Sequence, residues 1–208
     1  MAYIPDRQHA LAGDYAQMYF GLLTRAYSTI DWNQVTKAGE MLSTAAMAGR
    51  RIYSCGNGGS AAIANHLVCD CMKGARTDST IAPEVISLSA TVELITAIAN
   101  DIGVEEMFAY QVSSLGKPGD VLISISSSGA SPNIVEALKR AKDIRMHTIA
   151  MSGFEGGASR AVADISLHVA AENYGVIEDT HQSLMHILAQ YLRQAHIDDV
   201  SKLGRIKF

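Results

Sequence analysis

The chain has 208 residues, of which 48% are apolar and 18% are charged, and its formal net charge is −4. A weak negative charge gives no bulk attraction to nucleic acid or to an anionic membrane. No apolar run approaches the roughly 20 residues that a helix needs to cross a bilayer. We therefore expect a single domain over residues 1–208, with neither nucleic acid nor a membrane as its partner.

Cysteine use indicates a reduced compartment. Cys55, Cys69 and Cys71 are odd in number, and no secretory signal begins the chain. Cys69 and Cys71 would point to different sides of a helix, whereas a zinc-binding pair usually has two residues between its cysteines. We expect small buried thiols and a cytoplasmic location.

Two amphipathic helices are expected first, over residues 15–30 and 32–49, with Asp31 as the N-cap between them. This N-terminal region, at about 13–49, carries more apolar residues than one helix face packed on a sheet requires. We therefore expect these helices to take part in subunit contacts. The residues that suggest this are Tyr19, Leu22, Leu23 and Tyr27.

The rest of the chain alternates between strand-like and helical patterns. The strand-like runs are RRIYSC, PEVISLS, DVLISIS, MHTIAMS and DISLHVA. The helical stretches lie near 60–73, 91–114, 131–144 and 177–196. This alternation predicts the α/β fold class, with a mostly parallel sheet covered by helices on both faces.

Two loops follow predicted strands, at the sheet edge where ligands of open parallel sheets bind. GNGGS (56–60) opens a helix, and its backbone amides and helix N-terminus favour an anion. SISSSGASPN (124–133) places several hydroxyls before the next helix, which suits a phosphate monoester. Glycine and serine are also ordinary turn and cap residues, so either loop alone is compatible with a plain connection.

No nucleotide cofactor is expected. The first loop does not space its glycines as G-x-G-x-x-G, and the second predicted strand does not end in an acidic residue that would hold a ribose. The phosphate-binding pattern G-x-x-x-x-G-K-[ST] is absent from the sequence.

Four segments carry a resemblance to a known family: SCGNGGSAAIANHLVCD, AIANDIGVEEMF, GDVLISISSSGASPNIVEALKRAK and EDTHQSLMHIL. Their order and spacing resemble those of the sugar isomerase (SIS) family, and within it those of the bacterial phosphoheptose isomerases. The resemblance covers about residues 15–195. It implies a three-layer α/β/α sandwich with a five-stranded parallel sheet, preceded by two N-terminal helices. It also implies a homotetramer whose active sites take residues from neighbouring subunits.

The resemblance assigns substrate contacts position by position. Asn57, Gly58 and Ser60 lie where the family's first loop meets the sugar phosphate, and Asp101 matches an acidic position near the substrate hydroxyls. The family's phosphate-holding loop is matched by Ser126, Ser127, Ser128 and Ser131.

Four ionisable residues carry the expected chemistry. His66 and Asp70 are four residues apart on one predicted helix, and Glu178 and His186 are eight apart on another, about 80° around the helix axis. An isomerisation through an enediol needs one group to move a proton between adjacent carbons and another to serve the oxygens, and a carboxylate and an imidazole suit these tasks.

In the family, the equivalents of His66 and His186 also bind a divalent metal, generally taken to be zinc. Two imidazoles and two oxygen ligands make an acceptable zinc shell. We expect His66, Asp70, Glu178 and His186 to converge on one such site, within one chain or across a subunit boundary.

The sequence departs from the usual family pattern at two positions. Asp70 stands where the best-known members have a Glu as the proposed base, and Glu178 stands where they have a Gln. The shorter arm of Asp70 would lower the rate unless the backbone shifts. Either Asp70 or Glu178 can then be the base, with His186 as its partner, or both carboxylates form a more anionic metal site.

The resemblance implies an aldose–ketose isomerase. Its substrate would be sedoheptulose 7-phosphate, converted through an enediol to D-glycero-D-manno-heptose 7-phosphate for cell-surface heptose biosynthesis. The alternative is a non-catalytic SIS protein that binds a phosphosugar or, as one relative does, the replication initiator. The ionisable residues favour the enzyme, because a scaffold has no physical reason to keep four such groups beside a phosphate pocket.

Overall fold

The computed structural model describes residues 5–205, so the two ends of the expected domain, 1–4 and 206–208, lie outside the described residues. The helices are α1 (Ala12–Ser28), α2 (Trp32–Met47), α3 (Gly59–Cys69), α4 (Val92–Asp101), α5 (Ala109–Leu115), α6 (Pro132–Asp143), α7 (Gly157–Val162) and α8 (Tyr174–Ala195). The strands are β1 (Arg51–Gly56), β2 (Glu84–Ser87), β3 (Val121–Ser126), β4 (His147–Ser152) and β5 (Ile165–His168). None of the helices within 5–205 is long and apolar enough to span a bilayer.

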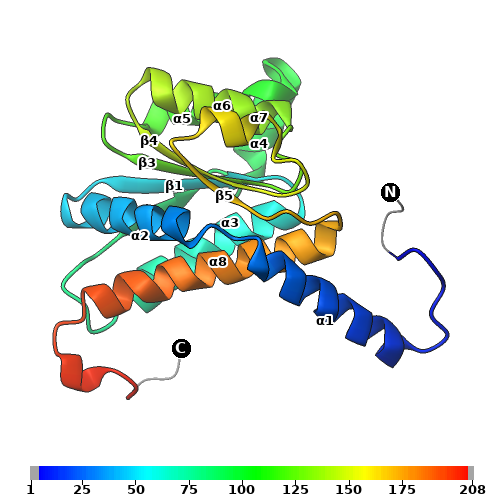
Figure 1. Ribbon diagram of the computed structural model, residues 1–208. Helices are drawn as coiled ribbons and strands as arrows, with labels where there is room; N and C mark the ends of the chain where they lie inside the picture. Colours follow the sequence, from blue (N-terminus) through cyan, green and yellow to red (C-terminus); the bar gives the residue numbers. More distant parts are fainter. Residues whose placement is uncertain (1–4, 206–208) are drawn as a thin grey trace.

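The sheet is the middle layer of the fold and decides where a ligand binds (Figure 1). Its strand order is β2-β1-β3-β4-β5, and every neighbouring pair is parallel. The chain adds β2 on one side of β1 and then crosses to the other side for β3, so the direction of growth reverses between β1 and β3. Ligands of such sheets bind beyond the carboxyl ends of the strands at this reversal. The predicted fold class is confirmed, and the loops after β1 and β3 lie at the reversal.

Helices cover both faces of the sheet, which completes three layers (Figure 1). α2, α3 and α8 pack on one face, and α6 and α7 pack on the other, with α5 against α6. All six residues of β3 are buried. Ile123 of this strand belongs to the hydrophobic cluster that contains Leu184 of α8, whereas Leu122 belongs to the cluster that contains Leu138 of α6. Successive side chains of a strand point to opposite faces of the sheet. Because helices cover both faces, consecutive residues of a central strand must be apolar or buried.

α1 extends away from the other helices and reaches the body of the fold through α8 (Figure 1). The hydroxyl of Tyr19 donates a hydrogen bond to Asp179 at 2.6 Å, and burial together with this carboxylate raises the pKa of Tyr19. The residues expected to face another subunit are partly buried against this chain's own core: Tyr19, Leu22, Leu23 and Tyr27. The large apolar side chains that α1 does expose are Tyr15 and Phe20.

Two predicted helical stretches are interrupted in the structure. The helix expected near 60–73 ends at Cys69 and continues as a π-helical turn, Asp70–Ala75. The stretch expected near 91–114 breaks after Asp101, where the backbone N–H of Gly103 bonds to the carbonyl of Ile98 at 3.0 Å. This hydrogen bond is typical of helix C-termini. Because it forms between backbone groups, the apolar pattern of the side chains does not reveal the break.

Candidate active site

The first candidate loop joins β1 to α3 and depends on glycine at two adjacent positions. Gly58 precedes the helix with φ of +51°, a conformation that residues with a Cβ rarely adopt. Gly59 begins the helix, and a Cβ at this position would overlap the carboxylate of Glu178. Glu178 therefore lies over the N-terminus of α3, where the helix dipole favours a negative charge.

The two candidate loops are bonded to each other. The amide nitrogen of Asn57 donates to the amide oxygen of Asn133 at 3.0 Å, and the amide nitrogen of Asn133 donates back at 2.9 Å. Asn133 is buried in the first turn of α6. These reciprocal bonds hold the start of α3 beside the start of α6, so that both helix N-termini face the reversal of the sheet.

The second loop presents serine hydroxyls at the start of α6. The hydroxyl oxygens of Ser126 and Ser128 accept hydrogen bonds at 3.2 Å from the backbone N–H groups of Gly129 and Ala130, respectively. Among the described residues, the buried hydroxyl of Ser127 has no hydrogen-bond partner. Ser131 is the N-cap of α6 without a side-chain capping bond. A buried polar atom without a partner is unfavourable, and a bound anion would satisfy it.

The other two predicted substrate contacts lie in different places. Ser60 is buried in the first turn of α3, next to the first loop. Asp101 is exposed at the end of α4, where its carboxylate accepts a hydrogen bond from Asn100 at 2.7 Å. α4 lies with α5, α6 and α7 on the opposite side of the sheet from α3 and α8 (Figure 1). One chain therefore does not place Asp101 with the residues of α3 and α8.

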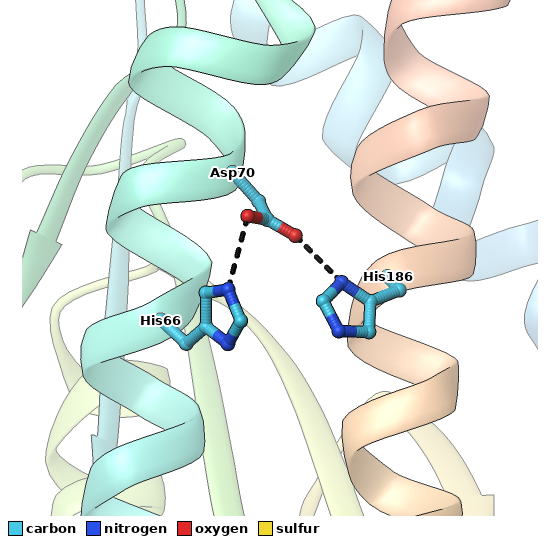
Figure 2. Close-up of side chains that lie close together, drawn as sticks. All are labelled: His66, Asp70 and His186. Atoms are coloured by element: carbon cyan, nitrogen blue, oxygen red, sulfur yellow. Dashed lines mark hydrogen bonds and ion pairs between the residues drawn. The ribbon is translucent and has the colours of Figure 1, made fainter. Parts of the chain in front are cut away.

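Three of the predicted chemical residues meet between α3 and α8 (Figure 2). One oxygen of Asp70 lies 3.2 Å from Nε2 of His66, and the other lies 2.7 Å from Nδ1 of His186. His66 and Asp70 are on one face because they are four residues apart, and α8 brings His186 to them. One ligand atom from each of the three lies within 4.8 Å of the others.

The structure adds Gln182, which the sequence analysis did not single out. Its amide nitrogen lies 3.0 Å from Nδ1 of His66 and 2.9 Å from Nε2 of His186. Gln182 precedes His186 by four residues, so both side chains lie on the same face of α8. This spacing is the signal that would have identified it.

Glu178 does not join this cluster within one chain, which corrects the single-chain form of the expected convergence and leaves the form across a subunit boundary as a prediction. Eight residues separate Glu178 from His186, and they correspond to about 12 Å along the helix axis. The carboxylate of Glu178 instead lies over Gly59, at the first loop.

The cluster is accessible from solvent. The exposed fractions of the side chains are 45% for His66, 38% for His186 and 23% for Asp70. They line one end of a cavity of about 940 Å³ that continues along α8 to Tyr191 and along the π-helical turn to Lys73. A small polar ligand can therefore reach both imidazoles.

A second histidine of α8 is excluded from the chemistry by burial. His181 is fully buried, and burial lowers its pKa to about 4. It is therefore neutral at neutral pH and lies in the core rather than in the cavity. The chemistry of α8 thus rests on the face that carries Gln182 and His186.

The donor set fits zinc. Two imidazole nitrogens and one carboxylate oxygen are common zinc ligands, and bonds of about 2.0 to 2.2 Å place ligand atoms roughly 3.4 Å apart in a tetrahedral shell. The contact of 3.2 Å between Asp70 and His66 is close to that spacing, and the three ligand atoms all lie within 4.8 Å of one another. Three protein ligands would leave one position open for substrate or water.

Comparisons with known proteins agree with the fold and the loops. The SIS domain family matches residues 14–153, so the resemblance noted in the sequence is confirmed. The chain is 39% identical over 159 residues to the phosphoheptose isomerase of Campylobacter jejuni, covering 76% of this chain and 85% of that protein. It is 36% identical over 173 residues to the probable phosphoheptose isomerase of Thermoplasma acidophilum, covering 83% and 94%. The solved phosphoheptose isomerase of Neisseria gonorrhoeae has a TM-score of 0.80 and 32% identity, covering 88% of this chain and 98% of that chain.

Replacing either imidazole should abolish zinc binding, because His66→Ala and His186→Ala each leave only two of the three clustered donors. Glu178→Gln should bind zinc as tightly as the unchanged protein, since Glu178 lies at Gly59. Isothermal titration calorimetry with Zn²⁺ measures all three variants. A clear loss of affinity in Glu178→Gln would show that this side chain reaches the metal.

Proposed function

Because this chain belongs to the SIS domain family, we propose that it is a phosphosugar isomerase that interconverts sedoheptulose 7-phosphate and D-glycero-D-manno-heptose 7-phosphate. The names of its relatives support this substrate. The observation that supports the reaction is the contact of 2.7 Å between Asp70 and His186, beside His66, in a cluster that is accessible from solvent. A carboxylate and an imidazole in contact supply the two groups that an enediol mechanism needs.

The spacing of the site suits a seven-carbon substrate. We place the phosphate at the starts of α3 and α6, where Ser60 and the loop serines offer hydroxyls and amides. His66 follows Gly59 by seven residues, or about 10 Å of helix rise. The eight bonds from the phosphorus of a 7-phosphate to C1 also span about 10 Å at roughly 1.25 Å per bond. A five-carbon phosphate would fall short of the cluster by about two bonds.

Within this arrangement Asp70 is the base that removes a proton from C1 of the ketose and returns a proton to C2. His186 is its partner, and the contact of 2.7 Å between the two side chains orients the carboxylate. Zinc held by His66, Asp70 and His186 would polarise the carbonyl and stabilise the enediolate. Glu178, at Gly59, accepts hydrogen bonds from the sugar hydroxyls nearest to the phosphate.

The proposal extends to a homotetramer. Asp101 lies away from α3 and α8 in one chain, so a neighbouring subunit is needed to bring an Asp101 to the site. Large apolar side chains are exposed along α1 and the outer face of α8, which supports a subunit interface. They are Tyr15, Phe20, Ile187 and Tyr191. Static light scattering at micromolar concentration should give four times the chain mass, and a monomer would contradict this part of the proposal.

The two carboxylates can be separated by their kinetics. With zinc at saturation, Asp70→Asn should lower kcat by about 10² to 10⁴-fold, the usual contribution of a general base. Glu178→Gln should mainly raise KM, because it removes a contact that is made before the transition state as well. Aldose formation from sedoheptulose 7-phosphate, followed by NMR, measures both variants. Full activity of both variants would show that neither carboxylate is the base, whereas no aldose formation by the unchanged protein would favour the non-catalytic, phosphosugar-binding protein.

The phosphate position is tested by the loop serines. Replacing both Ser126 and Ser128 by Ala should weaken sugar-phosphate binding by about tenfold or more, since each hydrogen bond to a charged group contributes roughly 1.5 to 3 kcal/mol. Ser114→Ala is the control, because this hydroxyl lies outside both loops and donates a hydrogen bond to the carbonyl of Tyr110 within α5. Calorimetric titration with the substrate measures the affinities. If the double variant binds like the control, the phosphate does not bind at this loop.

A further inference from the structure

Four side chains between α3 and α8 form a closed ring of hydrogen bonds. Asp70 contacts Nε2 of His66 at 3.2 Å and Nδ1 of His186 at 2.7 Å. Gln182 contacts the remaining ring nitrogens, Nδ1 of His66 at 3.0 Å and Nε2 of His186 at 2.9 Å. Each imidazole is therefore held at one nitrogen by the carboxylate and at the other by the amide.

The hydrogens of this ring can be assigned by counting donors and acceptors. An ionised carboxylate only accepts, so Nε2 of His66 and Nδ1 of His186 carry the hydrogens that face Asp70. The other nitrogen of each neutral imidazole then accepts. The amide group of Gln182 has two N–H donors, one for each of these nitrogens. In this arrangement each imidazole is held in one tautomer, and every contact of the ring pairs a donor with an acceptor.

We propose that Gln182 is a positioning residue that fixes the orientation and tautomer of both metal-binding imidazoles. This inference rests on the zinc site of the proposed function. Zinc bound between Asp70 and the imidazoles would take Nε2 of His66 and Nδ1 of His186. Each imidazole would then carry its hydrogen at the nitrogen that faces Gln182.

Gln182 is suited to both states because an amide has a donor end and an acceptor end. Rotation of the side-chain amide by 180° would present its oxygen to the N–H groups of both imidazoles when zinc is bound, without any movement of the backbone. Histidine ligands of metals usually donate their second N–H to such an oxygen, and loss of this partner typically weakens metal binding by about 10 to 100-fold. An apolar side chain offers neither end, and a carboxylate offers only the acceptor end.

The test compares Gln182→Met with Gln190→Met, a control that lies about two turns further along the same helix and lines the cavity beside His186. Calorimetric titration with Zn²⁺ should show an affinity about 10 to 100-fold weaker for Gln182→Met and unchanged for Gln190→Met. Gln182→Glu should keep most of the zinc affinity, because its carboxylate still accepts from both imidazoles.

A second measurement reads the tautomers directly, by ¹⁵N NMR of the imidazoles in the metal-free protein. The unchanged chain should show His66 protonated at Nε2 and His186 at Nδ1, and both Gln182→Met and Gln182→Glu should lose these single tautomers. The inference is overturned if the tautomers are the opposite ones or are unaffected, if Gln182→Met binds zinc normally, or if the unchanged protein binds no zinc. Since no sugar is used, a failure of the isomerase proposal is detected separately.

Discussion

The candidate site depends on one carboxylate that two imidazoles from different helices share. Asp70 is the first residue of the π-helical turn that ends α3, and π-helical turns occur often at functional positions. Its two oxygens fix His66 on its own helix and His186 on α8. The buried residues Leu67 and Leu184 belong to the core cluster beneath these helices. Packing below the site therefore sets the distance at which the polar groups meet above it.

The proposed reaction uses two ends of α3 for two kinds of binding. At its start, backbone amides and serine hydroxyls suit a phosphate, whose charge is spread over several oxygens. Two turns further along, side chains of defined geometry suit a metal and a proton transfer. The reciprocal bonds between Asn57 and Asn133 tie the phosphate end to the reversal of the sheet. In this proposal the helix between the two ends fixes the distance from the phosphate to the cluster, and so favours a substrate of one length.

The positions of Asp70 and Glu178 explain how this chain accommodates its two departures from the family pattern. Asp70 contacts both imidazoles although its side chain is one methylene shorter than that of a Glu. The additional carboxylate, Glu178, lies at the N-terminus of α3, where its charge is favourable. Gln182 closes the cluster on the side opposite Asp70. The negative charge is thereby divided between the first loop and the imidazole cluster instead of being concentrated at the cluster.

The sequence by itself determined the α/β alternation, the two glycine and serine loops, and the pairing of His66 with Asp70, because these follow from local periodicity and from spacing within one helix. Only the tertiary structure decided that α8 meets this pair with Gln182 and not with Glu178. The residues concerned are 116 positions apart, and their meeting depends on the level at which two helices cross. That level is set by the packing of buried side chains over the whole sheet, and no local spacing encodes it.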